Sequence, residues 1–260
     1  MTRALIGFGS NLGDSAHLVR TAAQMLDQRP CRVLRLSPLV SSRAVGGPAG
    51  QNDYVNAVAL VDTSWNRRQL ARRLREIEQR LGRQRTVHWG PRHIDLDLLL
   101  DERPPQRSPE LTVPHPRMAL RPFVLAPAVH VAADFFHGRL EATLAALWDR
   151  LQTSPRWIYC HFANEAATAE NRLLDRLREA LRGRWHLGPA FPEAPSAIPR
   201  LAVTCASKSA VAVPAAPVRL GFGPLLPTIE VPDSGWETPV LSDMVALIEG
   251  TETRLKWLSD

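Results

Sequence analysis

Apolar residues in the first 150 positions follow two different periods, which together predict a sheet covered by helices. Short apolar or alternating runs, typical of strands, occupy residues 4–9, 31–36, 54–61 and 94–100. Apolar residues recur every three or four positions over 15–28 and from about Ser64 to Gly82, which predicts two amphipathic helices. The order strand, helix, strand, strand, helix, strand is that of the ferredoxin-like split βαβ fold. We therefore expect an α+β domain with an antiparallel sheet and helices.

The pattern changes near residue 153. Before it, residues 111–116 and 123–131 are apolar segments, and a helix is predicted near 140–151. After it, we predict a helix at 164–182, short strands at 201–205 and 210–213, and a last helix at 242–249. Ten of the 22 prolines fall between positions 189 and 239. We therefore divide the chain into a first domain, 1–152, and a C-terminal extension, 153–260, of mixed α/β structure.

The composition of the 260 residues is that of a globular protein, with 45% hydrophobic and 22% charged residues. No run of 18 apolar residues occurs, and the first residues lack the pattern of a secretory signal, so we expect a cytoplasmic protein without membrane contact. Cys31, Cys160 and Cys205 are far apart and form no C-x-x-C, which argues against a disulfide framework and a zinc knuckle.

The net charge of +6 is distributed unevenly. Residues 1–152 contain 21 arginines, no lysine and 14 acidic residues, whereas residues 153–260 contain 11 basic and 12 acidic residues. An anionic ligand is therefore expected at the first domain. The absence of lysine there favours a compact phosphate site over a nucleic-acid surface, because the planar guanidinium matches phosphate geometry.

Two aspartates on the predicted strand 94–100 are the strongest candidates for metal ligands. Side chains alternate along a strand, so the four aliphatic residues at even positions should share the core face, and Asp95 and Asp97 the other face. Mg²⁺ is typically bound by one or two carboxylates together with substrate phosphates. A bare D-x-D is more often a solvated acidic face. Here Trp89, a Gly-Pro turn and Arg92 precede the pair, which favours a metal-phosphate site.

Several arginines and one histidine lie in loops that flank this strand, at Arg83, Arg85, Arg92, Arg117, Arg121 and His115. Phosphoryl-type transfer requires positioning and charge neutralisation more than covalent help from the protein, so these residues are candidates for phosphate contacts. The arginines of segment 67–80 are instead expected on the solvated face of a helix.

The glycine-rich segment 7–13 follows a strand and precedes a helix, as a dinucleotide-binding turn does. Its spacing is G-x-G-x-x-x-G, however, and no acidic residue ends the next strand. We therefore interpret it as a tight turn in which Ser10, Asn11 or Asp14 caps the helix. No G-x-x-x-x-G-K-[ST] sequence occurs, so a P-loop is excluded.

Motifs in order along residues 1–152 resemble those of the 6-hydroxymethyl-7,8-dihydropterin pyrophosphokinases of folate biosynthesis. The matching segments are 9–14, 46–57, Glu78, 82–83, 113–115, 121–125 and, most specifically, the W-G-P-R-x-[IL]-D-[IL]-D string of 89–97. The resemblance implies transfer of pyrophosphate from ATP to the hydroxymethyl group of the dihydropterin, which yields the pterin diphosphate and AMP. It also implies a ferredoxin-like α+β fold and two Mg²⁺ ions.

The resemblance assigns roles to residues of this sequence. Asp95 and Asp97 should hold the metal ions, and Arg83 and Arg92 should be the cations nearest the transition state. The implied nucleotide contacts are Glu78, Arg85, Arg92, His115 and Arg121. The implied pterin contacts are Val45, Gly46, Tyr54, Asn56, Trp89 and Phe123. These types suit a pterin, since a flat ring stacks between aromatics and an amide offers both a donor and an acceptor.

Three features of the sequence depart from the family pattern or leave the function open. Segment 41–45 lacks the usual aromatic, threonine and proline, and the loop 83–88 is about one residue shorter than in some members. The extension carries no aldolase or synthase motif, which leaves a structural appendage, an oligomerisation element or a binding module. A degenerate module that only binds nucleotide or RNA is the alternative to the enzyme.

Overall fold

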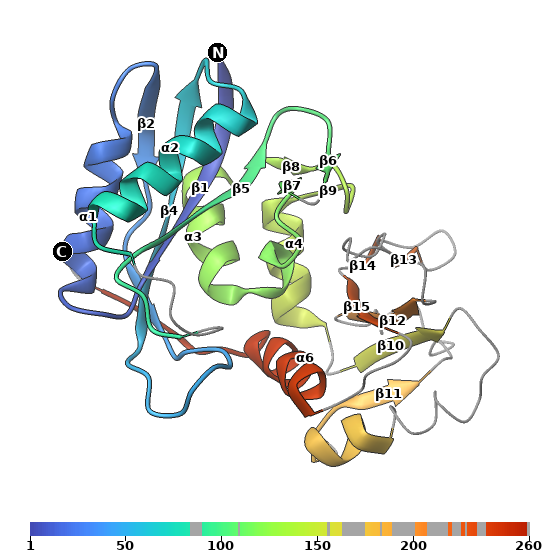
Figure 1. Ribbon diagram of the computed structural model, residues 1–260. Coiled ribbons are helices and arrows are strands. Elements are labelled where there is room, and N and C mark those ends of the chain that lie inside the picture. The colour runs from blue at the N-terminus through green and yellow to red at the C-terminus, as the bar shows by residue number, and fades with distance from the viewer. Residues whose placement is uncertain are drawn as a thin grey trace.

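The computed structural model describes residues 1–83, 90–108, 110–154, 157–162, 175–182, 184–188, 201–206, 218–219, 225–226, 228–232 and 238–258. Its largest unit is a six-stranded antiparallel sheet (Figure 1). The strands are β1 (Thr2–Ser10), β2 (Cys31–Leu36), β3 (Val40–Ser42), β4 (Tyr54–Thr63), β5 (Asp95–Asp101) and β16 (Leu255–Trp257). Their order is β16-β3-β4-β1-β5, and β2 also pairs with β4. The predicted ferredoxin-like arrangement is confirmed.

Two amphipathic helices, α1 (Ser15–Leu26) and α2 (Arg67–Arg80), cover one face of this sheet. Their apolar residues pack on Ile6, Phe8 and other residues of the strands in one buried cluster. The Asp14 side chain caps α1 by accepting from the backbone N–H of His17 at 3.0 Å, which selects one of the three predicted caps. Helix α2 begins later than Ser64, because Asn66 and Gln69 form a capping box there.

The opposite face packs against η1 (Met118–Leu120), α3 (Pro122–Ala132) and α4 (Leu144–Thr153). Leu100 lies in this second cluster, so its predicted place on the same face as Leu98 is wrong. The reason is a register shift between β1 and β5. Leu5 pairs with Leu100 and Ile6 with Leu98, so Leu99 is an extra residue that reverses the alternation.

Arg67 is an exception among the arginines that were expected in solvent. It is buried, and its Nε donates to Asp101 Oδ2 at 2.9 Å. The pair joins α2 to β5.

Two short hairpins follow β5 in the sequence, each a separate two-stranded sheet. Their strands are β6 (Gln106–Arg107) with β7 (Thr112–Val113), and β8 (Phe136–His137) with β9 (Ala142–Thr143).

A second, parallel sheet follows α4. Its strands are β10 (Trp157–Phe162), β11 (His186–Gly188), β12 (Leu201–Ala206) and β15 (Thr228–Pro232), in the order β11-β10-β12-β15. β13 (Val218–Arg219) pairs with β14 (Leu225–Leu226). The predicted strand 201–205 is confirmed, and residues 175–180 of the predicted helix 164–182 are helical. The segments 164–174 and 210–213 lie outside the described residues.

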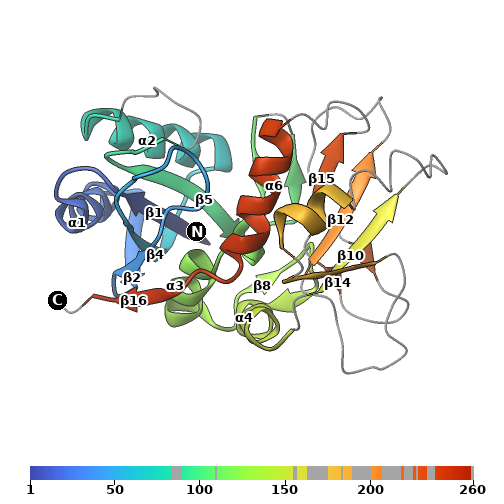
Figure 2. The ribbon, with the colours of Figure 1, turned by 90° about the horizontal axis from the view of Figure 1, so that it is seen from below.

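The chain then returns to the first sheet. Helix α6 (Thr238–Gly250), somewhat longer than predicted, lies between the two sheets (Figures 1 and 2). The strand β16 that follows pairs with β3 at the edge of the six-stranded sheet. The boundary between two domains at residue 152 therefore stays a prediction. Strand β16, although it lies after this boundary, pairs with a strand of the first domain. No helix within the described ranges is long and apolar enough to cross a bilayer.

Candidate active site

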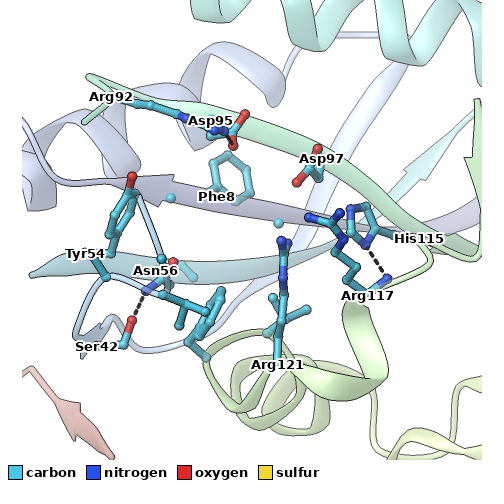
Figure 3. Close-up of a pocket in the computed structure, with 18 of the residues that line it drawn as sticks. Phe8, Ser42, Tyr54, Asn56, Arg92, Asp95, Asp97, His115, Arg117 and Arg121 are labelled. Carbon is cyan, nitrogen blue, oxygen red and sulfur yellow. Dashed lines mark hydrogen bonds and ion pairs between the residues drawn. The ribbon is translucent and has the colours of Figure 1, made fainter. Parts of the chain in front are cut away.

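A cavity of about 330 Å³ opens on the α3 side of the six-stranded sheet. This volume lies within the range of small-molecule sites. β1, β3, β4 and β5 form its floor and sides, and the loop after β3, the segments that precede η1 and α3, and α6 complete it. Tyr54 and Asn56 lie toward one end, and His115 and Arg117 toward the other (Figure 3).

The floor of the cavity is open because β1 carries glycines there. Gly7 pairs with Asp97, and Gly9 pairs with both Asn56 and Asp95 on its two neighbouring strands. A Cβ atom at Gly9 would lie 3.3 Å from Asn56 Oδ1. A larger side chain there would fill the space between the amide and the acidic pair, so the glycine keeps this part of the site accessible to a ligand.

Asp95 and Asp97 point into the cavity from β5, as Figure 3 shows. The Asp95 carboxylate binds two guanidinium groups, since Arg83 Nη1 lies 2.7 Å from its Oδ1 and Arg92 Nη1 contacts its Oδ2. Asp97 makes no hydrogen bond or ion pair with any other residue that the structure describes. The two carboxylates therefore differ: one is already paired with cations, and the other faces the cavity with its oxygens available.

Glu78 lies behind the cavity rather than on its surface. It is buried in α2, its Oε1 accepts from the backbone N–H of Leu96 at 2.7 Å, and the same oxygen pairs with Arg83 Nη1. Burial raises the pKa of its carboxyl group. The structure thus puts Glu78 in contact with Arg83 and the backbone of β5, a position suited to orienting Arg83.

The turn at the end of β1 holds the segment that carries Arg92. Asn11 Oδ1 accepts from the backbone N–H of Arg92 at 2.7 Å, and the backbone N–H of Asn11 donates to the carbonyl of Arg92 at 3.0 Å. The Asn11 amide nitrogen also donates to the Asn52 carbonyl at 3.3 Å. From the sequence Asn11 is a possible helix cap and part of the matching segment 9–14, but its contact with Arg92, 81 positions away, leaves no local signal.

The far end of the cavity is cationic. Arg121 lies deep beside Arg117 and faces Asp97. Burial, opposed by Asp97 and reinforced by Arg117, lowers its pKa to about 10, so it remains charged at neutral pH. Its guanidinium carbon lies 5.7 Å from the centre of the Phe123 ring. Arg117 was named as a flanking arginine by its position in the sequence, and the structure adds it to the lining of the cavity.

His115 is neutral in this environment. Burial, together with the positive charges of Arg121 and Arg117, lowers its pKa to about 3. Its Nδ1 accepts from the backbone N–H of Arg117 at 3.1 Å, so the imidazole proton lies on Nε2. His115 can therefore donate one hydrogen bond into the cavity but cannot act there as a base at neutral pH.

The lowered pKa of His115 predicts acid sensitivity of the fold. Between about pH 6.5 and pH 3 the unfolded chain binds a proton at this position that the folded chain does not, so stability should fall as pH decreases through this range. Urea unfolding of the wild type and of His115→Gln at pH 7 and pH 5 tests this. The variant should lose less stability on acidification. An equal loss in both proteins would contradict the assignment. His137, whose pKa is also lowered, to about 4, is present in both proteins, so its contribution cancels when the two losses of stability are compared.

The other end of the cavity is suited to a flat polar ring. Asn56 Nδ2 donates to Ser42 Oγ at 3.0 Å, which leaves Asn56 Oδ1 directed to the ligand space as an acceptor. Tyr54 and Phe123 supply aromatic surface, and the Tyr54 hydroxyl donates to the Gly90 carbonyl at 3.3 Å. Val45 and Gly46, in the loop that follows Ser42, also line the cavity.

Most predicted site residues meet at this cavity. Those on its surface are Val45, Gly46, Tyr54, Asn56, Arg83, Arg92, Asp95, Asp97, His115, Arg121 and Phe123. Arg85 and Trp89 lie outside the described residues, so their roles stay predictions. Sequence analysis did not identify Ser42, which orients Asn56, or Leu247, which reaches the cavity from α6.

The acidic pair fits a magnesium site better than a site for a softer metal. The described residues contain no cluster of three or more histidine, cysteine or acidic side chains that could enclose a metal ion. Two carboxylates on one strand face, with Asp97 unpaired among the residues that the structure describes, instead offer hard oxygen ligands on one side only. Mg²⁺ accepts such an incomplete set, because phosphates and water supply the remaining ligands.

Residues 5–133 match the family of 7,8-dihydro-6-hydroxymethylpterin-pyrophosphokinases (HPPK). The 2-amino-4-hydroxy-6-hydroxymethyldihydropteridine pyrophosphokinase of Synechocystis sp. is 35% identical over 155 residues, which are 59% of this chain and 78% of that protein. The enzyme of the same name from Bacillus subtilis is 40% identical over 129 residues, 49% of this chain and 77% of that protein. A crystal structure of Plasmodium falciparum HPPK-DHPS matches 78% of this chain and 56% of its own length, with 12% identity and a TM-score of 0.44.

Proposed function

The chain belongs to the 7,8-dihydro-6-hydroxymethylpterin-pyrophosphokinase family, and from this premise we propose how its cavity binds and activates the substrates. The enzyme transfers a pyrophosphoryl group from ATP to 6-hydroxymethyl-7,8-dihydropterin, a step of folate biosynthesis. One arrangement in the cavity carries the proposal. The acidic pair and the cationic residues face each other at its centre, and an amide with two aromatic rings lies at one end.

This arrangement separates two kinds of ligand. A triphosphate needs cations and hydrogen-bond donors. Arg92 and Arg121 supply the positive charge, and neutral His115 can donate a hydrogen bond from Nε2. A neutral pterin needs stacking surface and hydrogen bonds to its polar edge, which Tyr54 and Asn56 offer. We assign the triphosphate to the first group and the pterin to the second, so that the hydroxymethyl group lies next to the phosphates.

Asp95 and Asp97 are the residues that would hold Mg²⁺. The ion would supply positive charge that offsets the charge developing on the phosphates, while the two carboxylates hold it beside them. Asp95 is paired with Arg83 and Arg92, so the phosphates of a bound nucleotide would compete with its carboxylate for both guanidinium groups. Glu78 forms an ion pair with Arg83 on the side away from the cavity. We therefore assign it a positioning role rather than a direct contact with the nucleotide.

The transfer itself makes and breaks one bond to the β-phosphorus of ATP. The hydroxyl oxygen of the pterin bonds to this phosphorus, the bond from phosphorus to the oxygen that bridges to the α-phosphate breaks, and AMP leaves with that oxygen. The hydroxyl proton passes to solvent, since His115 is a poor base. The protein therefore contributes alignment of the two reacting atoms and stabilisation of charge rather than covalent catalysis.

Asn56 should set the affinity for the pterin. Replacement by alanine removes the acceptor Oδ1 that faces the ligand and leaves Ser42 Oγ without this partner. We expect the Asn56→Ala variant to raise KM for the dihydropterin by about 10- to 100-fold, the effect of one or two lost hydrogen bonds, with KM for ATP within about twofold of the wild type. Steady-state kinetics with each substrate varied in turn measures both constants. A rise confined to KM for ATP would contradict the placement of the pterin.

The reaction is tested by AMP formation. Purified full-length protein with ATP, Mg²⁺ and the dihydropterin should release AMP and the pterin diphosphate in equal amounts, and omission of the pterin should abolish AMP release. Oligonucleotide affinity that falls steeply with salt, without any turnover, would instead support the alternative of a module that only binds nucleic acid. That outcome would overturn the proposed function.

A further inference from the structure

The wall of the cavity beside Val45 comes from the C-terminal end of the chain. Leu247 of α6 is nearly buried and lines the cavity together with residues of the first domain. Helix α6 and β16 lie more than 100 positions beyond the end of the family match at residue 133. The site is therefore built partly from a segment that the family match does not cover.

Helix α6 contacts the pterin side of the cavity through its last turn. A Cβ atom added at Gly250 would lie 2.7 Å from Val45 Cγ1 and 3.2 Å from its Cγ2. The Val45 side chain thus packs directly on the helix backbone, and only a glycine permits this approach. On the same helix, Met244 and Ile248 are buried, which fixes the helix against its surroundings.

Strand β16 pairs with β3, whose last residue, Ser42, precedes the loop that contains Val45. In this pairing Leu255 lies opposite Ser42, and the backbone N–H of Leu258 donates to the Leu39 carbonyl at 2.9 Å. Ser42 in turn accepts from Asn56 at 3.0 Å. Ser42 therefore links the C-terminal strand to Asn56, the side chain assigned to the pterin.

The loop between β3 and β4 has little structure of its own. Gly46, Gly47 and Gly50 all have positive φ values between 73° and 78°, and residues 47–50 are exposed. Within the loop, Gln51 Nε2 donates to the Gly46 carbonyl at 3.1 Å. Glycine-rich segments lose more conformational entropy on ordering than others do, so outside contacts are needed to keep such a loop in one position.

We propose that α6 and β16 complete the pterin site through Leu247, through Gly250 and through the pairing of β16 with β3. Leu247 contacts the ligand space, and Gly250 with β16 positions residues 42–46 so that the site is preformed for the ring. Preorganisation of this kind raises affinity because binding no longer has to order the loop. The inference rests on the proposed function. The parallel sheet is then an insertion in the sequence between α4 and α6, and α6 and β16 belong with the catalytic domain.

Gly250→Ala tests the positioning role in the full-length chain. The added methyl group would displace Val45 and with it the pterin side of the loop. We expect KM for the dihydropterin to rise about tenfold, and KM for ATP and kcat to stay within about twofold. Alanine favours a helix more than glycine does, so a loss of affinity would not arise from weakening of α6. The same shift should appear in equilibrium binding of the oxidised pterin, followed by its fluorescence without ATP.

The pair Gly250→Ala and Val45→Ala separates positioning from general damage. Shortening Val45 makes room for the methyl group, so the double variant should bind the pterin more tightly than the two single effects predict together. Glu249→Gln is the matched control. Its side chain pairs with Arg184 on the surface, and the variant should have wild-type KM values. Leu247→Ala, which introduces no clash, should raise only KM for the pterin, by about threefold.

The outcomes distinguish this inference from the proposed function. A wild-type chain that forms no AMP would overturn the proposed function. An active wild type, with Gly250→Ala and Leu247→Ala both unchanged in KM for the pterin, would overturn the role of residues 238–258 alone. Equal increases in both KM values, together with a lower melting temperature and strictly additive effects in the double variant, would also overturn it.

Discussion

The Asp97→Ala variant is expected to lose activity by about 10³-fold or more in kcat. Asp97 faces the cavity without a hydrogen bond or ion pair to any other described residue, so its carboxylate is available for Mg²⁺. Its removal would take one of only two carboxylate ligands from the proposed metal site, and the triphosphate would be less well aligned and less well neutralised. Its loss should reduce stability only slightly, because the side chain makes no described hydrogen bond or ion pair and contributes only its attraction for Arg121.

AMP formation measured over a range of Mg²⁺ concentrations tests this effect. Asp97→Ala should need more Mg²⁺ for half-maximal activity and should remain far below wild type at saturation. Asp62→Asn, on β4 and outside the cavity, is the matched control and should retain wild-type kinetics. An Asp97→Ala enzyme with full Mg²⁺-dependent turnover would remove Asp97 from the metal site.

The Arg121→Met variant is expected to be more stable and much less active. Burial and the like charge of Arg117 outweigh the attraction of Asp97 for this guanidinium, which forms no ion pair with a described residue. Methionine of similar length relieves that cost, so the free energy of unfolding should rise by about 1 kcal/mol. Activity should fall by about 10²- to 10³-fold, because a cation aimed at the phosphates is lost.

Urea unfolding and kcat/KM for ATP, measured on the same preparation, test the two effects together. Arg121→Lys keeps the charge but not the planar fork, so its activity should lie between those of the wild type and Arg121→Met. Arg139→Met serves as the control for loss of an arginine outside the cavity. A variant that is both active and stabilised would show that Arg121 has no role in the reaction.

Local patterns were enough to place the acidic pair. Side chains alternate along a strand, so the sequence around Asp95 and Asp97 predicts that both lie on one face, and the structure has both in the cavity. The same rule failed for Leu100, since a register shift against β1 inserts one extra residue. Alternation is a property of one strand, whereas a bulge depends on how two strands pair.

Contacts between residues far apart in the sequence could not be predicted in the same way. Arg67 sits in a helix rich in arginine, and nothing in its neighbours distinguishes it from the solvated ones. It is buried because Asp101, 34 positions away, lies beside it in the fold. The contact of Asn11 with Arg92 has the same character, and both depend on the packing of whole elements.

Local patterns in the sequence predict the order of elements in the first domain, the antiparallel ferredoxin-like sheet and the residues proposed to carry the chemistry. Short-range periodicity and the W-G-P-R string encode these features within a few neighbouring positions. The folded chain alone shows that α6 reaches the cavity through Leu247 and packs on Val45, and that β16 pairs with β3 at Ser42. Those contacts join positions about 200 residues apart, and they depend on where the chain returns after the parallel sheet rather than on any local propensity.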